Sequence, residues 1–133
     1  MLSNYPLATW MRSARSESGW RAIISWWESR RLAYNVIIGC VALISFPAYS
    51  AALSACGKIR PGQDLVEPLA LFLAPIAANA AYTGGWLFEV AWAQFFGERR
   101  ALGPALFVAG TLFSICIVLF PSVFWIVAWL RRP

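Results

Sequence analysis

Hydrophobic residues along the chain are concentrated in three long runs, at residues 32–56, 67–97 and 101–130. Each run exceeds the roughly 20 residues that an α-helix needs to cross a hydrocarbon core of about 30 Å. Backbone amides cannot bond to water inside a bilayer, so a crossing segment must pair them internally as a helix. The pattern therefore predicts an all-α integral membrane protein with three transmembrane helices.

Short polar segments between the runs predict how the helices are connected. Residues 57–66 combine Gly, Pro and charged residues and predict an outer loop. Residues 98–100 predict a tight inner turn, so that helices 67–97 and 101–130 form a long antiparallel hairpin whose first helix extends past the inner interface. Residues 131–133 form an outer tail. A four-span alternative needs a break near Gly84 and Gly85, which leaves a second piece of about a dozen residues, too short to cross.

Residues 1–31 precede the first run and are predicted to lie on the cytoplasmic side. Trp20, Ile23, Ile24 and Trp27 recur at the spacing of one helix face, which predicts an amphipathic helix over about residues 17–31. Such a helix lies in the membrane interface with its apolar face in the lipid. We interpret it as an anchor that orients the first span. A docking surface for a partner is the alternative.

Composition and charge support this assignment. The chain is 60% hydrophobic and 13% charged, whereas an ordinary soluble domain carries about 25% charged residues. The net charge of +5 comes from basic residues beside the apolar runs, which favours lipid head groups over nucleic acid as their partner. More basic residues fall on the predicted inner side, which places the N-terminus inside and the C-terminus outside. The predicted location is the bacterial inner (plasma) membrane.

Glu89 is the acidic residue that lies well inside an apolar run. A charge at the bilayer centre is costly and is treated as functional by default. Residues 69–88 already supply the roughly 20 residues of a span, so Glu89 is predicted at the inner interface. There we expect it to meet an arginine: Arg30, Arg31 or Arg99. A proton or cation relay through Glu89 is the alternative.

Beyond Glu89 the hairpin tip is strongly apolar, with Trp92, Phe95, Phe96 and Phe107. An exposed patch of this kind needs a cover in water. The tryptophans of the N-terminal segment lie on the same side of the membrane. We therefore expect one of them to pack against the tip: Trp20, Trp26 or Trp27.

The helix at 67–97 also carries polar and small residues. Asn79, Tyr82 and Thr83 are expected to face neighbouring helices and to form hydrogen bonds with them, with a substrate site as the alternative. Small residues recur at i, i+4, as in Ala77, Ala81 and Gly85, and this spacing lets helices approach closely. The pattern predicts that 67–97 is the central helix and that it also packs against a second copy.

Reactive residues are few. The chain has no His, and Cys40, Cys56 and Cys116 form no C-x-x-C pair, so we predict neither a metal site nor a cofactor. Residues 53–57 (LSACG) resemble a bacterial lipobox, which would make Cys56 a lipidation site. The segment before it is unusually long and two apolar runs follow, so we favour an unmodified Cys56.

These features predict a non-enzymatic membrane protein that acts by helix–helix association, as a homo-oligomer or in a larger membrane complex. Each run contains one proline in its interior, at Pro47, Pro75 and Pro121, and such a proline kinks a helix. Kinked helices together with Glu89 favour an alternative function as a small oligomeric channel or transporter. A membrane enzyme is the weakest hypothesis, because the catalytic motifs H-E-x-x-H and G-x-S-x-G are absent from the sequence.

Overall fold

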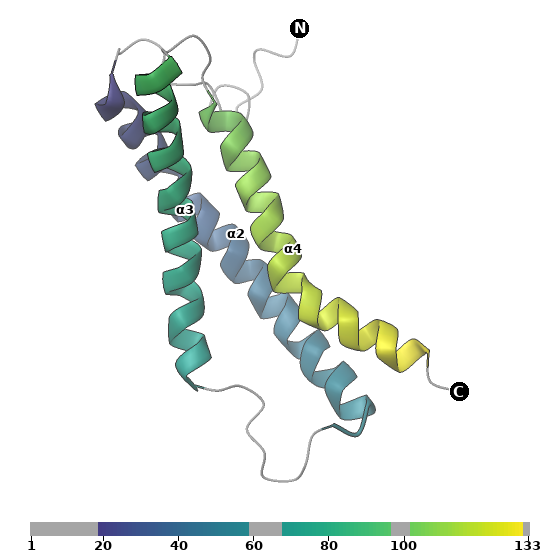
Figure 1. The fold of residues 1–133 in the computed structure, drawn as a ribbon. Helices are drawn as coiled ribbons and strands as arrows, with labels where there is room; N and C mark the ends of the chain where they lie inside the picture. The colour runs from purple at the N-terminus through teal and green to yellow at the C-terminus, as the bar shows by residue number, and fades with distance from the viewer. Residues whose placement is uncertain (1–18, 59–67, 97–101, 132–133) are drawn as a thin grey trace, which may run out of the picture.

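The computed structural model describes residues 19–58, 68–96 and 102–131, and almost all of them are helical. They form α2 (Trp20–Ala55), α3 (Pro68–Phe96) and α4 (Gly103–Leu130), shown in Figure 1. The all-helical prediction is confirmed for these residues. The predicted inner turn at 98–100 and most of the predicted outer loop lie outside the described residues.

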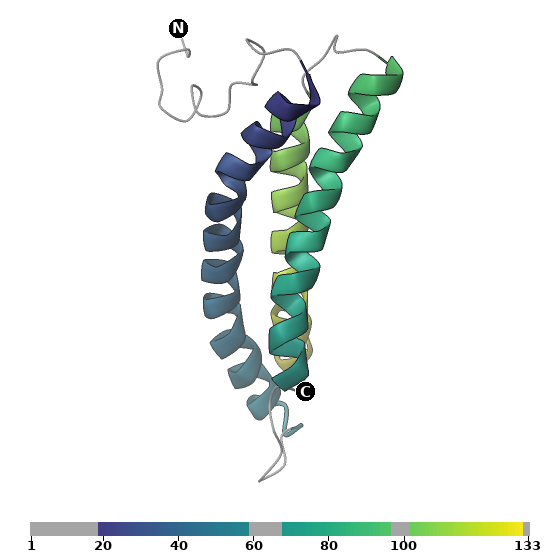
Figure 2. The ribbon, with the colours of Figure 1, turned by 90° about the vertical axis from the view of Figure 1, so that its left-hand side faces the viewer.

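α2 and α4 form the most extensive contact between helices. They run in the same direction, and α3, which runs the opposite way, contacts each of them less (Figures 1 and 2). The late turns of α3 and the first turn of α4 lie close together, and the two helices diverge toward the other end (Figure 1). The prediction that the helix at 67–97 is central is therefore wrong. α3 makes the fewest contacts of the three helices, and its many small side chains offer little apolar area to bury against its neighbours.

α2 runs without interruption through the predicted interfacial segment and the first predicted span. The separate amphipathic helix at 17–31 is not confirmed, because its described residues form the first turns of α2. Trp27 is buried, Ile23 and Ile24 are half-buried and Trp20 is exposed. α3 is likewise continuous through Gly84 and Gly85, so the break required by four spans does not occur there.

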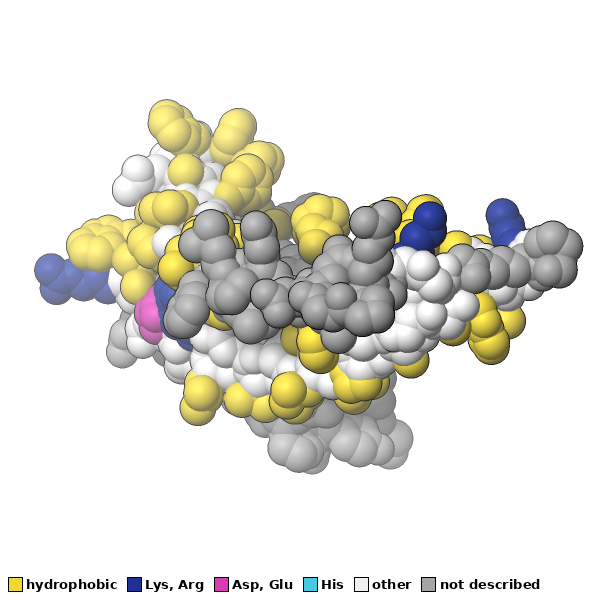
Figure 3. Space-filling model, turned by 90° about the horizontal axis from the view of Figure 1, so that it is seen from below, with side chains coloured by type: hydrophobic (Ala, Val, Ile, Leu, Met, Phe, Trp, Pro, Cys, Tyr) yellow, Lys and Arg dark blue, Asp and Glu magenta, His cyan; other side chains and the backbone are white. Residues whose placement is uncertain are grey.

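The described helices expose much apolar surface. Leu43 is 76% exposed and Phe95 is 83% exposed, and hydrophobic side chains project on several sides of the molecule in Figure 3. By length and composition, α2 and α4 are the two described helices that are apolar enough to cross a membrane. α3 does not belong to this pair, and Asn79, Thr83 and Glu89 lower its hydropathy. The two apolar helices indicate a membrane-associated protein.

Two serines join α2 to α4 close to the prolines of these helices. Pro47 lies inside α2 and Pro121 inside α4. Ser45 Oγ donates to Val118 O at 3.0 Å, and Ser122 Oγ donates to Ser45 O at 2.9 Å. The two hydroxyl oxygens are 2.6 Å apart, and both serines are buried. This Ser45–Ser122 contact fixes the spacing of α2 and α4 at the end where α3 has diverged.

Replacing Ser45 by Ala is expected to lower the free energy of unfolding by about 1 kcal/mol, because it removes a buried interhelical hydroxyl. Ser54→Ala is the matched control, since Ser54 Oγ donates to Ser50 O within α2 and its loss should cost little. The measurement is unfolding of the detergent-solubilised protein by SDS, followed by circular dichroism. Equal losses in the two variants would mean that the Ser45–Ser122 contact does not stabilise the pair of helices.

Candidate functional site

Glu89 lies at the end of the bundle where all three helices meet. Its side chain comes from α3 and is only 8% exposed. Trp27 Nε1 of α2 donates to Glu89 Oε2 at 2.6 Å, and the backbone N–H of Gly103 donates to Glu89 Oε1 at 2.6 Å. Gly103 is the first residue of α4, so the carboxylate satisfies an orphan N–H and faces the positive end of the α4 dipole. One carboxylate thus joins three helices.

The expected arginine partner of Glu89 is not confirmed. Within the described part of the chain, its hydrogen bonds come from an indole and a backbone amide. Arg31 pairs with Glu28 instead, with Nη2 to Oε1 at 2.6 Å. Arg99 lies outside the described residues. Neutral donors and the dipole of α4 therefore stand where an arginine was expected.

A cluster of buried aromatic side chains surrounds the Glu89 site. The Trp27 ring meets the Tyr82 ring edge-on with centroids 5.2 Å apart, and Tyr34 lies 4.8 Å from Tyr82. Phe107 of α4 is 6.2 Å from Trp26 and 6.1 Å from Trp27. The prediction that an N-terminal tryptophan covers the tip is confirmed for Phe107. Edge-on aromatic pairs of this kind each add about 0.5–1.5 kcal/mol beyond area burial.

Trp92, Phe95 and Phe96 behave differently from Phe107. They lie past Glu89 at the end of α3 and are exposed. Trp92 and Phe96 stack with ring centroids 4.3 Å apart, so they pack along their own helix. Among the described residues, the tryptophans of α2 therefore pack against Phe107 but not against these three aromatic residues.

Two glycines let the helices approach at this site. A Cβ on Gly85 would lie 2.9 Å from Trp27 Cη2, and a Cβ on Gly103 would lie 2.8 Å from Glu89 Oε2. Both distances are too short for a side chain without a shift of the neighbour. The sequence pattern places Gly85 on a face of small residues, and in the structure this glycine makes room for the Trp27 ring.

Tyr82 has a structural role in this arrangement. Its hydroxyl donates to the backbone carbonyl of Trp27 across the α2–α3 interface. The prediction that Tyr82 bonds to a neighbouring helix is met by this contact. The same contact holds the indole of Trp27 between α3 and α4, where it reaches Glu89.

A row of polar side chains follows the α2–α3 edge, formed by Glu28, Arg31, Asn35, Asn79 and Thr83. Arg31 donates from Nη1 to Asn79 Oδ1 and from Nη2 to Thr83 Oγ1, both at 3.3 Å. Asn35 and Asn79 exchange amide hydrogen bonds at 3.3 and 3.2 Å. The structure thus brings three predicted site residues together: Arg31, Asn79 and Thr83. Asn35 was missed, although its i, i+4 spacing from Arg31 could have placed it on the same face.

Arg30 does not join this row, although it is the next residue to Arg31. It is 7% exposed and its guanidinium lies 4.0 Å from the centre of the Trp26 ring. Arg30 Nη1 donates to Trp26 O at 2.7 Å and to Ser29 Oγ at 2.8 Å. Successive residues of a helix point about 100° apart, so Arg30 supports the aromatic cluster while Arg31 faces α3.

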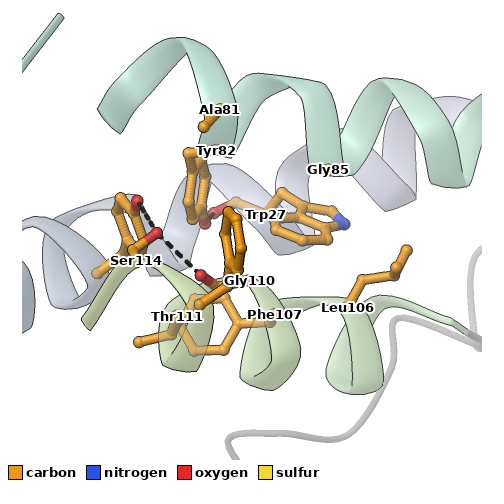
Figure 4. A pocket seen from close by; sticks show the side chains of 11 residues that line it. Trp27, Ala81, Tyr82, Gly85, Leu106, Phe107, Gly110, Thr111 and Ser114 are labelled. Atoms are coloured by element: carbon orange, nitrogen blue, oxygen red, sulfur yellow. Dashed lines mark hydrogen bonds between the residues drawn. The ribbon is translucent and has the colours of Figure 1, made fainter. Parts of the chain in front are cut away.

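A cavity of about 140 Å³ lies beside the aromatic cluster. Its walls come from all three helices, and Figure 4 shows Trp27 between the side chains of α3 and those of α4. Tyr34 OH and Ser114 Oγ are 2.9 Å apart at its edge. Aromatic walls and small neighbours, rather than charged groups, shape this cavity.

Cys56 is far from these groups in the chain. It caps the C-terminal end of α2 and is buried. Its lipidation stays an untested alternative. Comparison of the chain with protein-family models, with curated proteins and with solved structures found no match, so the geometry alone guides the functional interpretation.

The Glu89 contacts predict a coupled effect of two substitutions. Glu89→Gln should lower the free energy of unfolding by about 1–3 kcal/mol, because an amide offers one acceptor oxygen where the carboxylate offers two. Trp27→Phe removes the indole donor, so after it Glu89→Gln should cost at least about 0.5 kcal/mol less. Both are measured by SDS unfolding in detergent, singly and together.

Trp20→Phe serves as the control for this pair. Trp20 is half exposed at the start of α2. The decrease in the free energy of unfolding caused by Trp20→Phe should therefore simply add to that caused by Glu89→Gln. If the effects of Trp27→Phe and Glu89→Gln on the free energy of unfolding were also strictly additive, the hydrogen bond between the indole and the carboxylate would contribute nothing to stability.

Proposed function

We propose that this chain is an integral protein of the bacterial inner membrane that crosses the bilayer three times and acts without catalysis, by helix–helix association. Its N-terminus lies inside and its C-terminus outside. The partner is a second copy of the chain or a larger membrane protein. The observation that carries the proposal is the outward face of α3, which combines small residues with sparse packing inside the protomer.

Three spans are supported by the pairing of polar groups on α3. Asn79 and Thr83 would be costly to place in lipid alone, but both bond to α2 through Arg31 or Asn35. Satisfied polar groups lower the cost of burying such a helix in the bilayer. With 29 residues, α3 is longer than the roughly 20 residues that a span requires. Its predicted crossing therefore has both the length and the internal pairing it needs.

Association is supported by the residues that α3 turns outward. Ala77, Ala80, Ala81 and Gly84 are exposed, and a Cβ built on Gly84 meets nothing within 4 Å. Small residues at this spacing allow another helix to approach closely in a membrane, where van der Waals packing drives association. α3 makes less contact with its own neighbours than α2 and α4 make with each other. A second helix on this face would supply the packing that the protomer does not.

The contacts of Glu89 favour a structural role over a relay. A proton or cation pathway needs a carboxylate that a mobile ion can reach. Both oxygens of Glu89 accept hydrogen bonds from Trp27 and Gly103 in a buried setting. For that reason we prefer association to the channel or transporter alternative.

Gly84→Leu is expected to reduce self-association by about tenfold, because overpacking a close helix contact costs about 1–3 kcal/mol. The control is Gly39→Leu, a change of the same size at an exposed glycine of α2 that also has nothing within 4 Å of its Cβ. Energy transfer between donor- and acceptor-labelled copies in nanodiscs of several protein-to-lipid ratios measures the association. Equal energy transfer in the two variants would refute self-association through α3.

The orientation is tested separately with reporter fusions in a bacterial host. Alkaline phosphatase fused after residue 133 should be active, because the C-terminus is proposed to lie outside. Green fluorescent protein at the same place should stay dark, and it should fluoresce when fused after residue 98. A fluorescent fusion after residue 133 would place the C-terminus inside and exclude three spans with the N-terminus inside.

A further inference from the structure

The end of the bundle beyond Glu89 carries several exposed aromatic side chains. Phe95 is 83% exposed and Phe96 is 65% exposed at the end of α3, and Trp20 is half exposed at the start of α2. Trp92 is less exposed and stacks on Phe96. We call Trp20, Trp92, Phe95 and Phe96 the aromatic end. In water an apolar patch of this kind is a liability, so the aromatic end needs a cover.

The exposed rings of the two helices lie at about the same level along the bundle. Arg31 of α2 bonds to Asn79 and Thr83 of α3. α2 and α3 run in opposite directions, so residues before Arg31 lie level with residues after Thr83. At 1.5 Å per residue, Trp20 precedes Arg31 by about 16 Å and Trp92 follows Thr83 by about 14 Å. Trp20 and Trp92 therefore belong to one layer across the bundle.

The two sets of rings are nevertheless separated within this layer. Figure 2 shows the start of α2 and the end of α3 at the same end of the bundle but apart from each other. Their rings do not form one face that a single partner helix could cover. A bilayer surrounds a protein on all sides, so lipid can cover both sets at once.

Exposed polar side chains lie among these rings. Arg21 is exposed and its guanidinium lies 5.2 Å from the centre of the Trp20 ring. Gln94, which precedes Phe95, is also exposed. Hydrocarbon would strip water from the arginine charge, whereas water would leave the rings uncovered. The head-group layer suits both groups, because it takes up aromatic rings and basic side chains together.

The length of α3 leads to the same layer. Its 29 residues extend about 43 Å at 1.5 Å per residue. A bilayer is about 40–45 Å thick with its head groups and about 30 Å thick without them. A crossing helix that starts at the outer surface therefore ends in the inner head-group layer, and Phe96 is the last residue of α3.

We propose that the aromatic end lies in the phospholipid head-group layer of the inner leaflet and holds the bundle at a fixed depth in the membrane. Arg21 lies among the lipid phosphates, which carry the opposite charge. The inference rests on the crossing of α3 proposed above, and it adds the lipid partner of the inner end of that helix.

Spin labels test the proposal in the full chain, in liposomes of phosphatidylethanolamine and phosphatidylglycerol, after its three cysteines have been replaced by alanine. Gln94→Cys places a label in the aromatic end, Ile76→Cys places one within α3, and Lys58→Cys places one after α2, all at exposed positions. Electron paramagnetic resonance measures collisions with oxygen, which concentrates in hydrocarbon, and with a water-soluble nickel chelate. Circular dichroism checks that the helices are intact.

The Gln94→Cys label should give a depth between those of the Ile76→Cys and Lys58→Cys labels. Nickel collisions as frequent as at Lys58→Cys would place the aromatic end in water, and collisions like those at Ile76→Cys would place it in hydrocarbon. Protection from both reagents would mean that protein covers it. Each of these results overturns the proposal. Frequent nickel collisions at Ile76→Cys would instead contradict the crossing of α3, so the two failures can be told apart.

Removing the rings tests whether they hold this depth. In the double variant Trp92→Ala/Phe96→Ala, the Gln94→Cys label should shift toward the value of the Lys58→Cys label. The matched control is Phe120→Ala/Phe124→Ala, which removes an exposed aromatic pair of the same i, i+4 spacing from α4 and should leave the label unchanged. A label that stays at the same depth in both double variants would show that the rings do not anchor this end.

Discussion

The position of α3 depends on the hydrogen bonds that the Glu89 carboxylate accepts. A buried carboxylate without donors is costly in a low-dielectric setting, and here it obtains one donor from α2 and one from α4. Those two donors can be reached together only when the start of α4, the early turns of α2 and the late turns of α3 converge. The glycines at 85 and 103 follow from this constraint, because any side chain there would push Trp27 or Glu89 out of reach. One polar group therefore decides where three largely apolar helices meet.

The two ends of the bundle are consequently held in different ways. At the Glu89 end, all three helices contribute aromatic side chains to a buried cluster. At the Ser45–Ser122 end, α2 and α4 remain joined while α3 has moved away (Figure 1). Among the residues that the structure describes, α3 is thus held mainly by polar and aromatic contacts over its later turns. In lipid, apolar area by itself does not hold helices together, because the lipid tails are as apolar as the side chains. That is why specific hydrogen bonds and close glycine contacts determine the arrangement.

Sequence patterns predicted where the helices lie in the chain, but not which residues of one helix contact those of another. Runs of apolar residues predicted helices at 67–97 and 101–130, which correspond to α3 at Pro68–Phe96 and α4 at Gly103–Leu130. The run at 32–56 and the amphipathic pattern before it merge into α2, since both favour helix and no Gly or Pro lies near residue 31 to separate them. The importance of Glu89 was visible, because an acidic residue in an apolar run must be paired. Its partner was not, because an indole N–H and an orphan helix amide can also donate to a carboxylate, and no sequence pattern marks them as its donors. Which donor is used depends on where α4 begins, and that boundary cannot be read to the residue from hydropathy.

The neighbouring residues Arg30 and Arg31 also show that the contacts of a residue cannot be predicted from hydropathy and charge alone. Both are basic residues at the edge of an apolar run, so the sequence gives them one role, as marks of the inner interface. A turn of about 100° between successive helical residues separates them in space. Arg30 then lies on the Trp26 ring, whereas Arg31 reaches Asn79 and Thr83 on α3. The sequence predicts the same place for both residues, at the inner interface, but the helical phase in which Trp27 and Tyr34 are buried directs Arg30 to the aromatic cluster and Arg31 to α3. The arrangement at this end of the molecule accordingly depends on helical phase, because a rotation of α2 by one residue would turn Arg31 away from Asn79 and Thr83 and Trp27 away from Glu89.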